Sequence, residues 1–497
     1  MHQKTNWAQF GTLISVFFFW GFVAASNDIL IPVFQEKFNL SQAQSQLVAI
    51  AFYVAYTVGS IIYVAISKSV GSDLLNKIGY KNGIAVGLII SAIGTLLFYP
   101  AANNSSFTLM LSGLFIVGLG FSLQQIAANP LAIVIGDPAT GSQRLTMAGG
   151  VNNFGTTIGP LLVSFAIFGS VSAANTHASI ESVKTPYLIL GLAFVLVAVF
   201  FKFSSIPNHI DLDKVAESST GGEEDPFEGG EKLSGSHPAK LLHRKSAISY
   251  PQLWMGMIGI FVYVGVEVST ASNLPKYLKQ DLLISTDKVA PFISLYWASL
   301  MIGRWTGAVG AFGLSKAAQQ ALRFVMPYVA FGIFLLVNII GGHDIKPFAV
   351  YPLLIIVMII GDLLSKGNPA RMLLIFSSCG IAALLIGMAT SGMVSVYAFT
   401  SVGLFCSTLW PCVFTLAVTG LGKHTNQGSS LLIMMIMGGG FISLLQGALA
   451  DTKLGIHYSY ITGAACFAYL AFYAIRAKSV LKSQGIDFDA LQAGGGH

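Results

Sequence analysis

Apolar stretches of about 20 residues recur along almost the entire sequence, and this repetition constrains the fold more than any single motif. Of the 497 residues, 54% are hydrophobic and 10% are charged. A soluble globular chain carries about 25% charged residues, whereas a helix of roughly 20 apolar residues crosses a hydrocarbon core about 30 Å thick. The sequence therefore predicts an all-α polytopic membrane protein and argues against a soluble enzyme.

Hydropathy predicts six spans before a polar segment and eight after it, about fourteen in all. The first six lie near 10–34, 46–66, 83–102, 107–135, 146–168 and 186–203. The other eight lie near 253–275, 291–312, 324–340, 348–364, 372–390, 394–418, 431–449 and 461–475. We therefore expect an N-terminal half over 1–203, a linker over 204–249, a C-terminal half over 250–485 and a tail over 486–497. The linker is acidic and rich in glycine, as flexible tethers are.

Lysine and arginine are distributed unevenly between the two sets of loops. If the N-terminus is cytoplasmic, 14 of these residues from Lys68 to Lys482 lie inside and seven from Lys37 to Lys453 lie outside. Cytoplasmic loops collect positive charge, so we expect both termini in the cytoplasm and an even number of spans. The same bias accounts for the net charge of +6 without a nucleic-acid partner.

The two halves share a weak internal repeat. Pro32 and Pro275 lie 243 positions apart, and Tyr53 and Trp297 lie 244 apart, whereas GLF at 113–115 recurs at 403–405, an offset of 290. The offset therefore grows by roughly the length of two helices and a turn. This pattern predicts two six-helix halves that rock about a central site, with an inserted helix pair near 323–365.

The sequence shows no pattern of a membrane enzyme or a metal site. It contains no HExxH zinc motif, no GxSxG nucleophile elbow and no paired-aspartate intramembrane motif. The four cysteines lie in apolar runs without zinc or disulfide spacing, and we interpret them as packing residues. We expect no cofactor and no bound metal other than a coupling ion.

Two acidic residues lie at membrane depth, Asp28 in the first span and Glu267 in the seventh. Charged groups there are costly and usually face a bundle interior or a water-filled cavity. A carboxylate in such a place can take up a proton or ligate a sodium ion. Both acids are therefore candidate ion-coupling groups, although each could instead serve only in helix capping or a buried hydrogen bond.

Amides and aromatic residues on the same spans suit the hydroxyls and the apolar face of a neutral sugar. The candidate substrate-binding residues are Asn27, Gln124, Gln125, Asn129, Asn152, Asn153, Tyr263, Trp297, Trp410 and Gln446. Each amide could instead form hydrogen bonds that hold two helices together. Pro130 could simply kink its helix. Arg304, on the eighth span, could join a gate or extend toward the membrane interface.

Five motifs resemble the fucose:proton symporter family of the major facilitator superfamily, and within it the glucose/galactose and N-acetylglucosamine branches. They are NDILIP at 27–32, AANP at 127–130, NNFG at 152–155, YVGVE at 263–267 and GSS at 428–430 leading to GGG at 438–440. The resemblance covers most of both halves and implies the major facilitator fold. The two inserted helices depart from the usual twelve spans of the family.

The resemblance implies roles for four residues. Asp28 matches the essential acid of the first span, and Asn152 matches an amide near the sugar. Gln125 stands where the fucose symporter has a glutamate, and it is similar to the glucose-type branch, as Glu267 is. Fucose is therefore less favoured as a substrate.

We expect from this resemblance a symporter that imports a neutral hexose across a bacterial cytoplasmic membrane by alternating access, as a monomer. Protons are favoured as the coupling ion, with sodium as the alternative, and an N-acetylglucosamine or fucose transporter of the same family is the alternative in substrate. The alternative from another class is a membrane sensor that binds sugar without moving it.

Overall fold

The computed structural model describes residues 5–37, 42–137, 140–168, 184–209, 244–283 and 286–489. The side chains of 24–49, 160–161, 163–168 and 286–288 also lie outside the described part. In the ranges described, every regular element is a helix. The expected all-helical fold is confirmed.

Within the described residues, eight α-helices precede the linker. They are α1 (Trp7–Lys37), α2 (Gln42–Ser69), α3 (Leu74–Ile78), α4 (Tyr80–Leu96), α5 (Phe98–Asn103), α6 (Phe107–Val134), α7 (Gly141–Phe168) and α8 (Lys184–Phe203). After the linker come η4 (Ala247–Ser249), α10 (Pro251–Gln280), α11 (Thr286–Ala308), η5 (Val309–Phe312), α12 (Lys316–Ile340), η6 (Lys346–Val350), α13 (Tyr351–Ser365) and α14 (Pro369–Ala389). The remaining elements are α15 (Gly392–Cys406), α16 (Leu409–Val418), η7 (Gly422–His424), α17 (Thr425–Met434), η8 (Met435–Met437), α18 (Gly438–Ala450), α19 (Gly455–Ser459) and α20 (Ile461–Ser483).

Eleven of these helices, or helices joined end to end, are long and apolar enough to cross a membrane, counted over the described residues. Three further long helices, α1, α7 and α11, have 31, 28 and 23 residues. The number of about fourteen spans stays a prediction. The helical segment that contains the predicted span at 431–449 is longer than that span: it starts at Gly422, with polar residues that form hydrogen bonds inside the protein.

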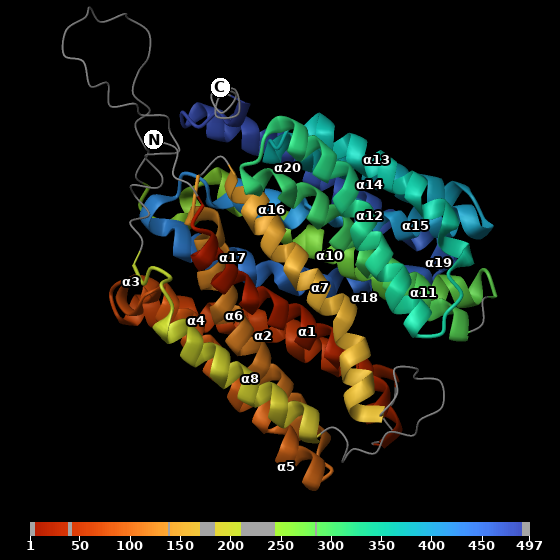
Figure 1. Cartoon of the computed structure of the whole chain (residues 1–497), viewed down its shortest axis with the longest axis horizontal. Helices are drawn as coiled ribbons and strands as arrows, with labels where there is room; N and C mark the ends of the chain where they lie inside the picture. Colours follow the sequence, from red (N-terminus) through yellow and green to blue (C-terminus); the bar gives the residue numbers. More distant parts are fainter. Residues whose placement is uncertain are drawn as a thin grey trace, which may run out of the picture.

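Helix packing follows the same scheme before and after the linker. In the first half, α1 packs on α7, α2 on α6, and α4 on both α6 and α8. In the second half, α10 packs on α18, α11 on α15, and α14 on both α15 and α20. Helices α12 and α13 have no counterparts in this scheme and lie beside α11 and α14 (Figure 1).

The seam between the halves is formed chiefly by α7 against α11 and α16, and by α2 and α6 against α17. We call the end of the bundle where α8 stops and α10 starts the linker end. There Tyr80 N–H, at the start of α4, donates to the Asn208 carbonyl at 2.8 Å, and Trp7 stacks on Phe312 at 5.3 Å. The start of the linker is thus tied to α4, and at the same end α1 contacts the second half through Phe312.

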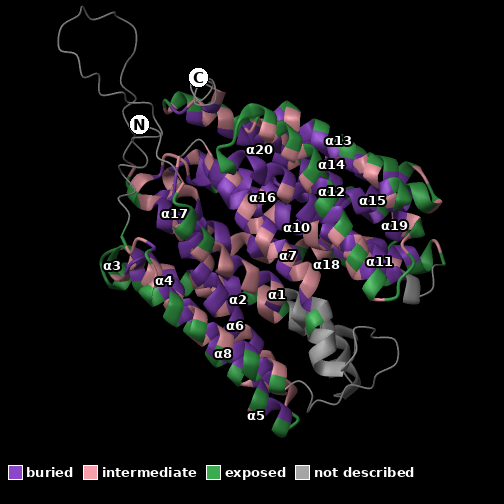
Figure 2. Ribbon diagram, in the orientation of Figure 1, coloured by how far each residue is buried: buried purple, intermediate pink, exposed green. Residues whose placement is uncertain are grey.

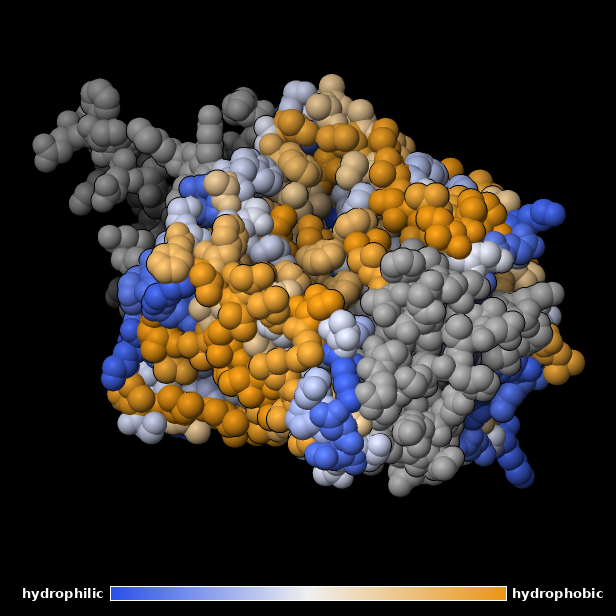
Figure 3. Space-filling view, turned by 60° about the horizontal axis from the view of Figure 1, so that its bottom comes forward, coloured by the Kyte–Doolittle hydropathy of each residue, from blue (hydrophilic) through white to orange (hydrophobic). Residues whose placement is uncertain are grey.

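The outer surface of the bundle is apolar. Leu196 on α8, Leu353 on α13 and Leu444 on α18 are each about 60% exposed (61%, 62% and 61%), and hydrophobic residues spread over the face in Figure 3. Buried residues fill the helix interfaces, while exposed ones follow the outer faces (Figure 2). Apolar surface of this extent is expected where the solvent is lipid.

Glycines allow α4 and α6 to cross closely. A Cβ atom built at Gly94 would lie 2.6 Å from the Gly113 carbonyl oxygen, and one at Gly120 would lie 2.4 Å from the Gly87 carbonyl oxygen. Both contacts are with backbone, which cannot move aside as a side chain can. Small residues at such crossings are a common basis of helix association in lipid.

We predict that Gly120→Val forces α4 and α6 apart and destabilises the protein by about 1–3 kcal/mol, as overpacking does. The measurement is the melting temperature of the detergent-purified protein. Gly332→Ala on α12 is the control, because a Cβ there meets no atom within 4 Å. Equal melting temperatures for Gly120→Val and wild type would contradict the packing described.

Candidate functional site

Glu267, Tyr263 and Arg304 form a polar cluster in the second half. Glu267 follows Tyr263 by four residues on α10, so both side chains lie on one helix face, and the Tyr263 hydroxyl donates to the Glu267 carboxylate. Arg304 Nη2 lies 3.3 Å from the Tyr263 oxygen and 3.9 Å from Glu267 Oε2. The guanidinium therefore faces the carboxylate with the phenol as their shared hydrogen-bond partner.

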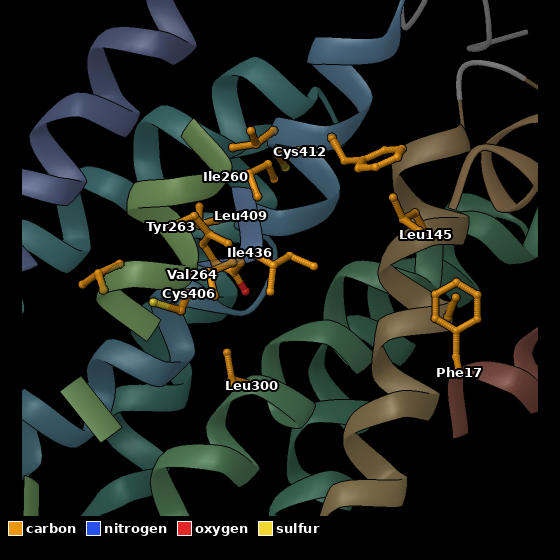
Figure 4. Close-up of a cluster of buried hydrophobic side chains, with 14 of the residues drawn as sticks. Phe17, Leu145, Ile260, Tyr263, Val264, Leu300, Cys406, Leu409, Cys412 and Ile436 are labelled. Atoms are coloured by element: carbon orange, nitrogen blue, oxygen red, sulfur yellow. The ribbon is translucent and has the colours of Figure 1, made fainter. Parts of the chain in front are cut away.

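The cluster lies in an apolar and largely dry setting. The side chains of Arg304 and Glu267 are only 10% and 15% exposed. Figure 4 shows Tyr263 on α10 close to Cys406 and Leu409, with Leu145 of α7 across the seam. Attraction between charges is stronger here than in water, and so is the cost of an unpaired charge.

Arg304 also joins the two halves. Its Nε donates to the Ser407 carbonyl at 2.9 Å, within the second half, and its Nη1 donates to the Gly149 carbonyl at 3.2 Å and to Asn153 Oδ1 on α7. Ser407 lies in the break between α15 and α16, where its carbonyl is open to a side-chain donor. One guanidinium thus binds α7, α10 and the broken helix together.

Two glycines on α7 make this contact possible. A Cβ at Gly149 would lie 3.2 Å from Arg304, and one at Gly150 would lie 2.9 Å from Trp305. Trp305 Nε1 donates to the Gly150 carbonyl at 3.2 Å. The Gly-Gly step therefore lets α11 approach the α7 backbone closely enough for two side chains to bond to it.

The amides of the first half occupy different environments. Gln124 is fully buried, accepts from Trp20 Nε1 at 2.8 Å and donates to Ser91 Oγ at 3.0 Å. Gln125 donates to the Tyr56 hydroxyl at 3.1 Å, and Asn152 donates to the Phe17 carbonyl at 3.0 Å; both residues are partly exposed. Gln124 thus holds helices together in this state, whereas Gln125 and Asn152 keep part of their surface free.

The other predicted site residues divide into three groups. Asn153 and Trp410 join the Arg304 cluster, with the Trp410 ring 6.2 Å from that of Tyr263. Among the described residues, Asn129, Trp297 and Gln446 form no hydrogen bond or ring contact with the cluster: Asn129 and Gln446 are buried, and Trp297 packs on Tyr296. Asn27 and Asp28 fall within α1, and their side chains lie outside the described residues.

A second polar cluster crosses the seam at the linker end, and the sequence did not single it out. Asn426, at the start of α17, accepts from the Tyr80 hydroxyl at 2.6 Å and donates to Asp73 Oδ1 at 3.0 Å. Asp73 also caps α3. Nothing in the sequence around Asn426 marks it as the partner of Asp73 and Tyr80.

The GSS motif on α17 belongs to the same seam. Ser429 Oγ donates to the Ile126 carbonyl at 3.0 Å, and Ser430 Oγ donates to the Ser60 carbonyl at 3.3 Å. Ile126 lies four residues before Pro130, which has no N–H to bond with that carbonyl. Pro130 therefore frees an acceptor on α6 that the opposite half uses.

The profile of the Major Facilitator Superfamily matches residues 10–345 of the chain. The chain is 33% identical over 475 residues to a glucose/galactose transporter of Brucella abortus, covering 95% of each protein. It is 27% identical to the L-fucose-proton symporter of Escherichia coli, covering 94% of this chain and 92% of the symporter.

A crystal structure of the Escherichia coli fucose:proton symporter matches the fold with a TM-score of 0.68 at 25% identity, over 94% of this chain and 98% of that one. A bacterial homologue of the iron transporter ferroportin, in its outward-facing state, matches with a TM-score of 0.59 at 12% identity. The latter likeness is one of fold alone. The chain belongs to the major facilitator superfamily, whose members are transporters.

We predict that Arg304→Lys weakens the seam even though it keeps the charge. A lysine ammonium cannot reproduce the planar fork that serves Ser407, Gly149 and Asn153 together, so buried acceptors lose their donor at about 1–3 kcal/mol. The measurement is the midpoint of thermal unfolding. Lys276→Arg, in an exposed pair with Asp451, is the control, and an unchanged midpoint for Arg304→Lys would refute the assigned contacts.

Proposed function

We propose that this protein imports a neutral hexose of the glucose or galactose type by cation symport, with protons as the coupling ion. The observation that carries the proposal is the cluster of Glu267, Tyr263 and Arg304, which connects an ionisable group to the seam between the halves. The relatives named as glucose/galactose transporters and as L-fucose-proton symporters support the substrate class.

The coupling step follows from the competition for Arg304. Ionised Glu267 attracts the guanidinium at 3.9 Å, while Asn153 and Gly149 of the opposite half bind its Nη1. Protonation removes the negative charge of Glu267 and with it most of the attraction. The position of Arg304, and hence the contact between α11 and α7, then depends on whether the ion is bound.

Such a dependence is sufficient for coupling. A ligand shifts a conformational equilibrium only by its difference in affinity for the two states, and Arg304 provides that difference because its partners belong to both halves. Asp28, which matches the first-span acid of the family, remains the leading ion-coupling group of the first half. Glu267 is the second.

The sugar would bind between the halves. Gln125 and Asn152 each use one donor within the protein, and an amide has a second donor and an acceptor left for a hydroxyl. Asn129 is a further candidate, because its buried Nδ2 has no partner among the described residues. Trp410 and Trp297, both partly exposed, could cover an apolar sugar face.

The proposed arrangement in the cell completes this account. We place the halves at 1–203 and 250–485, with the helix pair α12–α13 as an insertion in the second half. Both termini face the cytoplasm, and the protein acts as a monomer in the inner membrane of a bacterium. The linker end is then the cytoplasmic end.

Uptake into proteoliposomes tests the proposal. Labelled glucose, galactose, N-acetylglucosamine and fucose are supplied while a proton or a sodium gradient is imposed separately. We expect a proton gradient to drive accumulation of glucose or galactose, and we expect Asp28→Asn to retain only exchange. Glu267→Gln should lower gradient-driven accumulation at least tenfold.

Asp451→Asn is the matched control, because this carboxylate is 75% exposed and pairs with Lys276 on the surface. It should transport as the wild type does. Accumulation driven by sodium and not by protons would show that the coupling ion is sodium. Accumulation of N-acetylglucosamine or fucose alone would show that the proposed substrate is wrong. Sugar binding without accumulation under either gradient would favour the sensor.

A further inference from the structure

Helices α12 and α13 lie outside the packing scheme that the two halves share, but they are not isolated from the seam. Helix α13 packs on α11, α14 and α15, and α12 packs on α11 and also reaches α7 of the first half. A movement of α7 relative to α11 would therefore change the contacts of α12.

A buried ion pair joins the two helices. Arg323 Nη1 lies 2.7 Å from Asp362 Oδ2, and the side chains are 12% and 2% exposed. Ions taken out of water are costly unless they are paired and hydrogen-bonded. The pair fixes the Asp362 carboxylate, and therefore the inner face of α13, in one position.

That position is at the seam. A Cβ atom built at Gly307 of α11 would lie 4.0 Å from Asp362 Oδ1, 3.2 Å from Thr146 of α7 and 3.1 Å from Thr408. The space in front of Gly307 is therefore shared by the Asp362 carboxylate of the inserted pair and by side chains of both halves.

A cavity of about 10 Å³ lies at the same point. Its lining comes from α7, α11, α12, α13, α14 and α16, and includes Gln143, Thr146, Arg323, Asp362, Thr408 and Cys412. One water molecule needs roughly 10–15 Å³ of such space and two to four polar partners. The cavity is therefore of the right size and polarity for one water.

Two buried polar atoms in the lining have no partner within the described part of the chain. They are Gln143 Oε1, on the first half, and Thr408 Oγ1, in the break between α15 and α16. Thr408 is 2% exposed. A buried polar atom without a hydrogen bond is costly, so a bound water that serves both atoms would stabilise this arrangement.

We propose that α12 and α13 brace the seam between the halves at the linker end, through one bound water that joins Gln143, Thr408 and Asp362. The water accepts from the Thr408 hydroxyl and donates to Gln143 Oε1 and to the Asp362 carboxylate. Gln143 moves with the first half, whereas the other two move with the second. This joint therefore breaks when the linker end opens, which rests on the proposed alternating access.

Cys412 is a native reporter of this joint, because it lines the same cavity and is 2% exposed. The experiment measures how fast N-ethylmaleimide labels Cys412 in proteoliposomes without sugar, with the labelled peptide quantified by mass spectrometry. The test variants are Thr408→Val, Gln143→Leu and the double variant. Both single changes leave the Arg323–Asp362 pair intact. Asp362→Asn would break this buried pair and destabilise the fold, so it is not used as a test variant.

We expect each single variant to raise the labelling rate of Cys412 about five- to tenfold, and the double variant to add little, because both remove partners of the same water. Thr415→Val is the matched control: its hydroxyl is also buried and unpartnered among the described residues and lies on α16, but outside the cavity lining. The control should label as the wild type does. Equal rates for Thr408→Val and wild type, or a rise as large in Thr415→Val, would overturn the proposal.

A second reporter separates a gate from local loosening. Ser429→Cys places a thiol on α17, on a different part of the seam. Thr408→Val should also accelerate labelling there. An effect confined to Cys412 would mean that the substitution loosens only the local packing, and it would contradict the proposed role in holding the halves together. Neither readout needs sugar or an ion gradient. If the protein accumulates no sugar but labelling is accelerated at both thiols, the proposed function is wrong and the proposed role of α12 and α13 is supported.

Discussion

The Arg304 guanidinium is the interaction on which the arrangement of the two halves depends. It is buried in an apolar interior, where a cation is stable only if several acceptors surround it. Those acceptors come from α7, α10 and the break between α15 and α16, so no single half can satisfy it. A residue of this kind makes the contact between the halves specific, and its Nη2 lies 3.9 Å from the Glu267 carboxylate.

The seam obeys the rule that lipid imposes on every polar group. Because a backbone carbonyl in hydrocarbon cannot turn to bulk water, one that loses its helical donor is satisfied most favourably by a donor inside the protein. Pro130 leaves the Ile126 carbonyl without its helical donor, and Ser429 of the other half supplies one. Asn426 similarly serves Tyr80 and Asp73. Helix defects in one half are thus matched by side chains of the other.

Much of the fold was predictable because hydropathy and the repeat each report a separate physical constraint. The apolar runs anticipated the helices, and the jump in offset after Trp297 anticipated α12 and α13. Helix starts at polar residues were missed, as at Gly422, since hydropathy cannot recognise polar groups that are satisfied by a distant helix. Among the site residues, Glu267 was predicted to lie at membrane depth, and Arg304 to join a gate or to extend toward the interface. The contacts of Arg304 with Asn153 and Ser407 were not predicted.

The sequence by itself determined that the chain lies in lipid and that its halves are related. It also determined which charged groups lie at membrane depth, where a charge has a high free-energy cost. These properties follow from composition and order along the chain. The tertiary structure alone decided which groups meet: that Gln124 bonds with Trp20, that Asp362 reaches the seam, and that Gln143 and Thr408 share one cavity. The physical reason is that a side chain's partner is set by the crossing of helices far apart in sequence, and local pattern carries no record of those crossings.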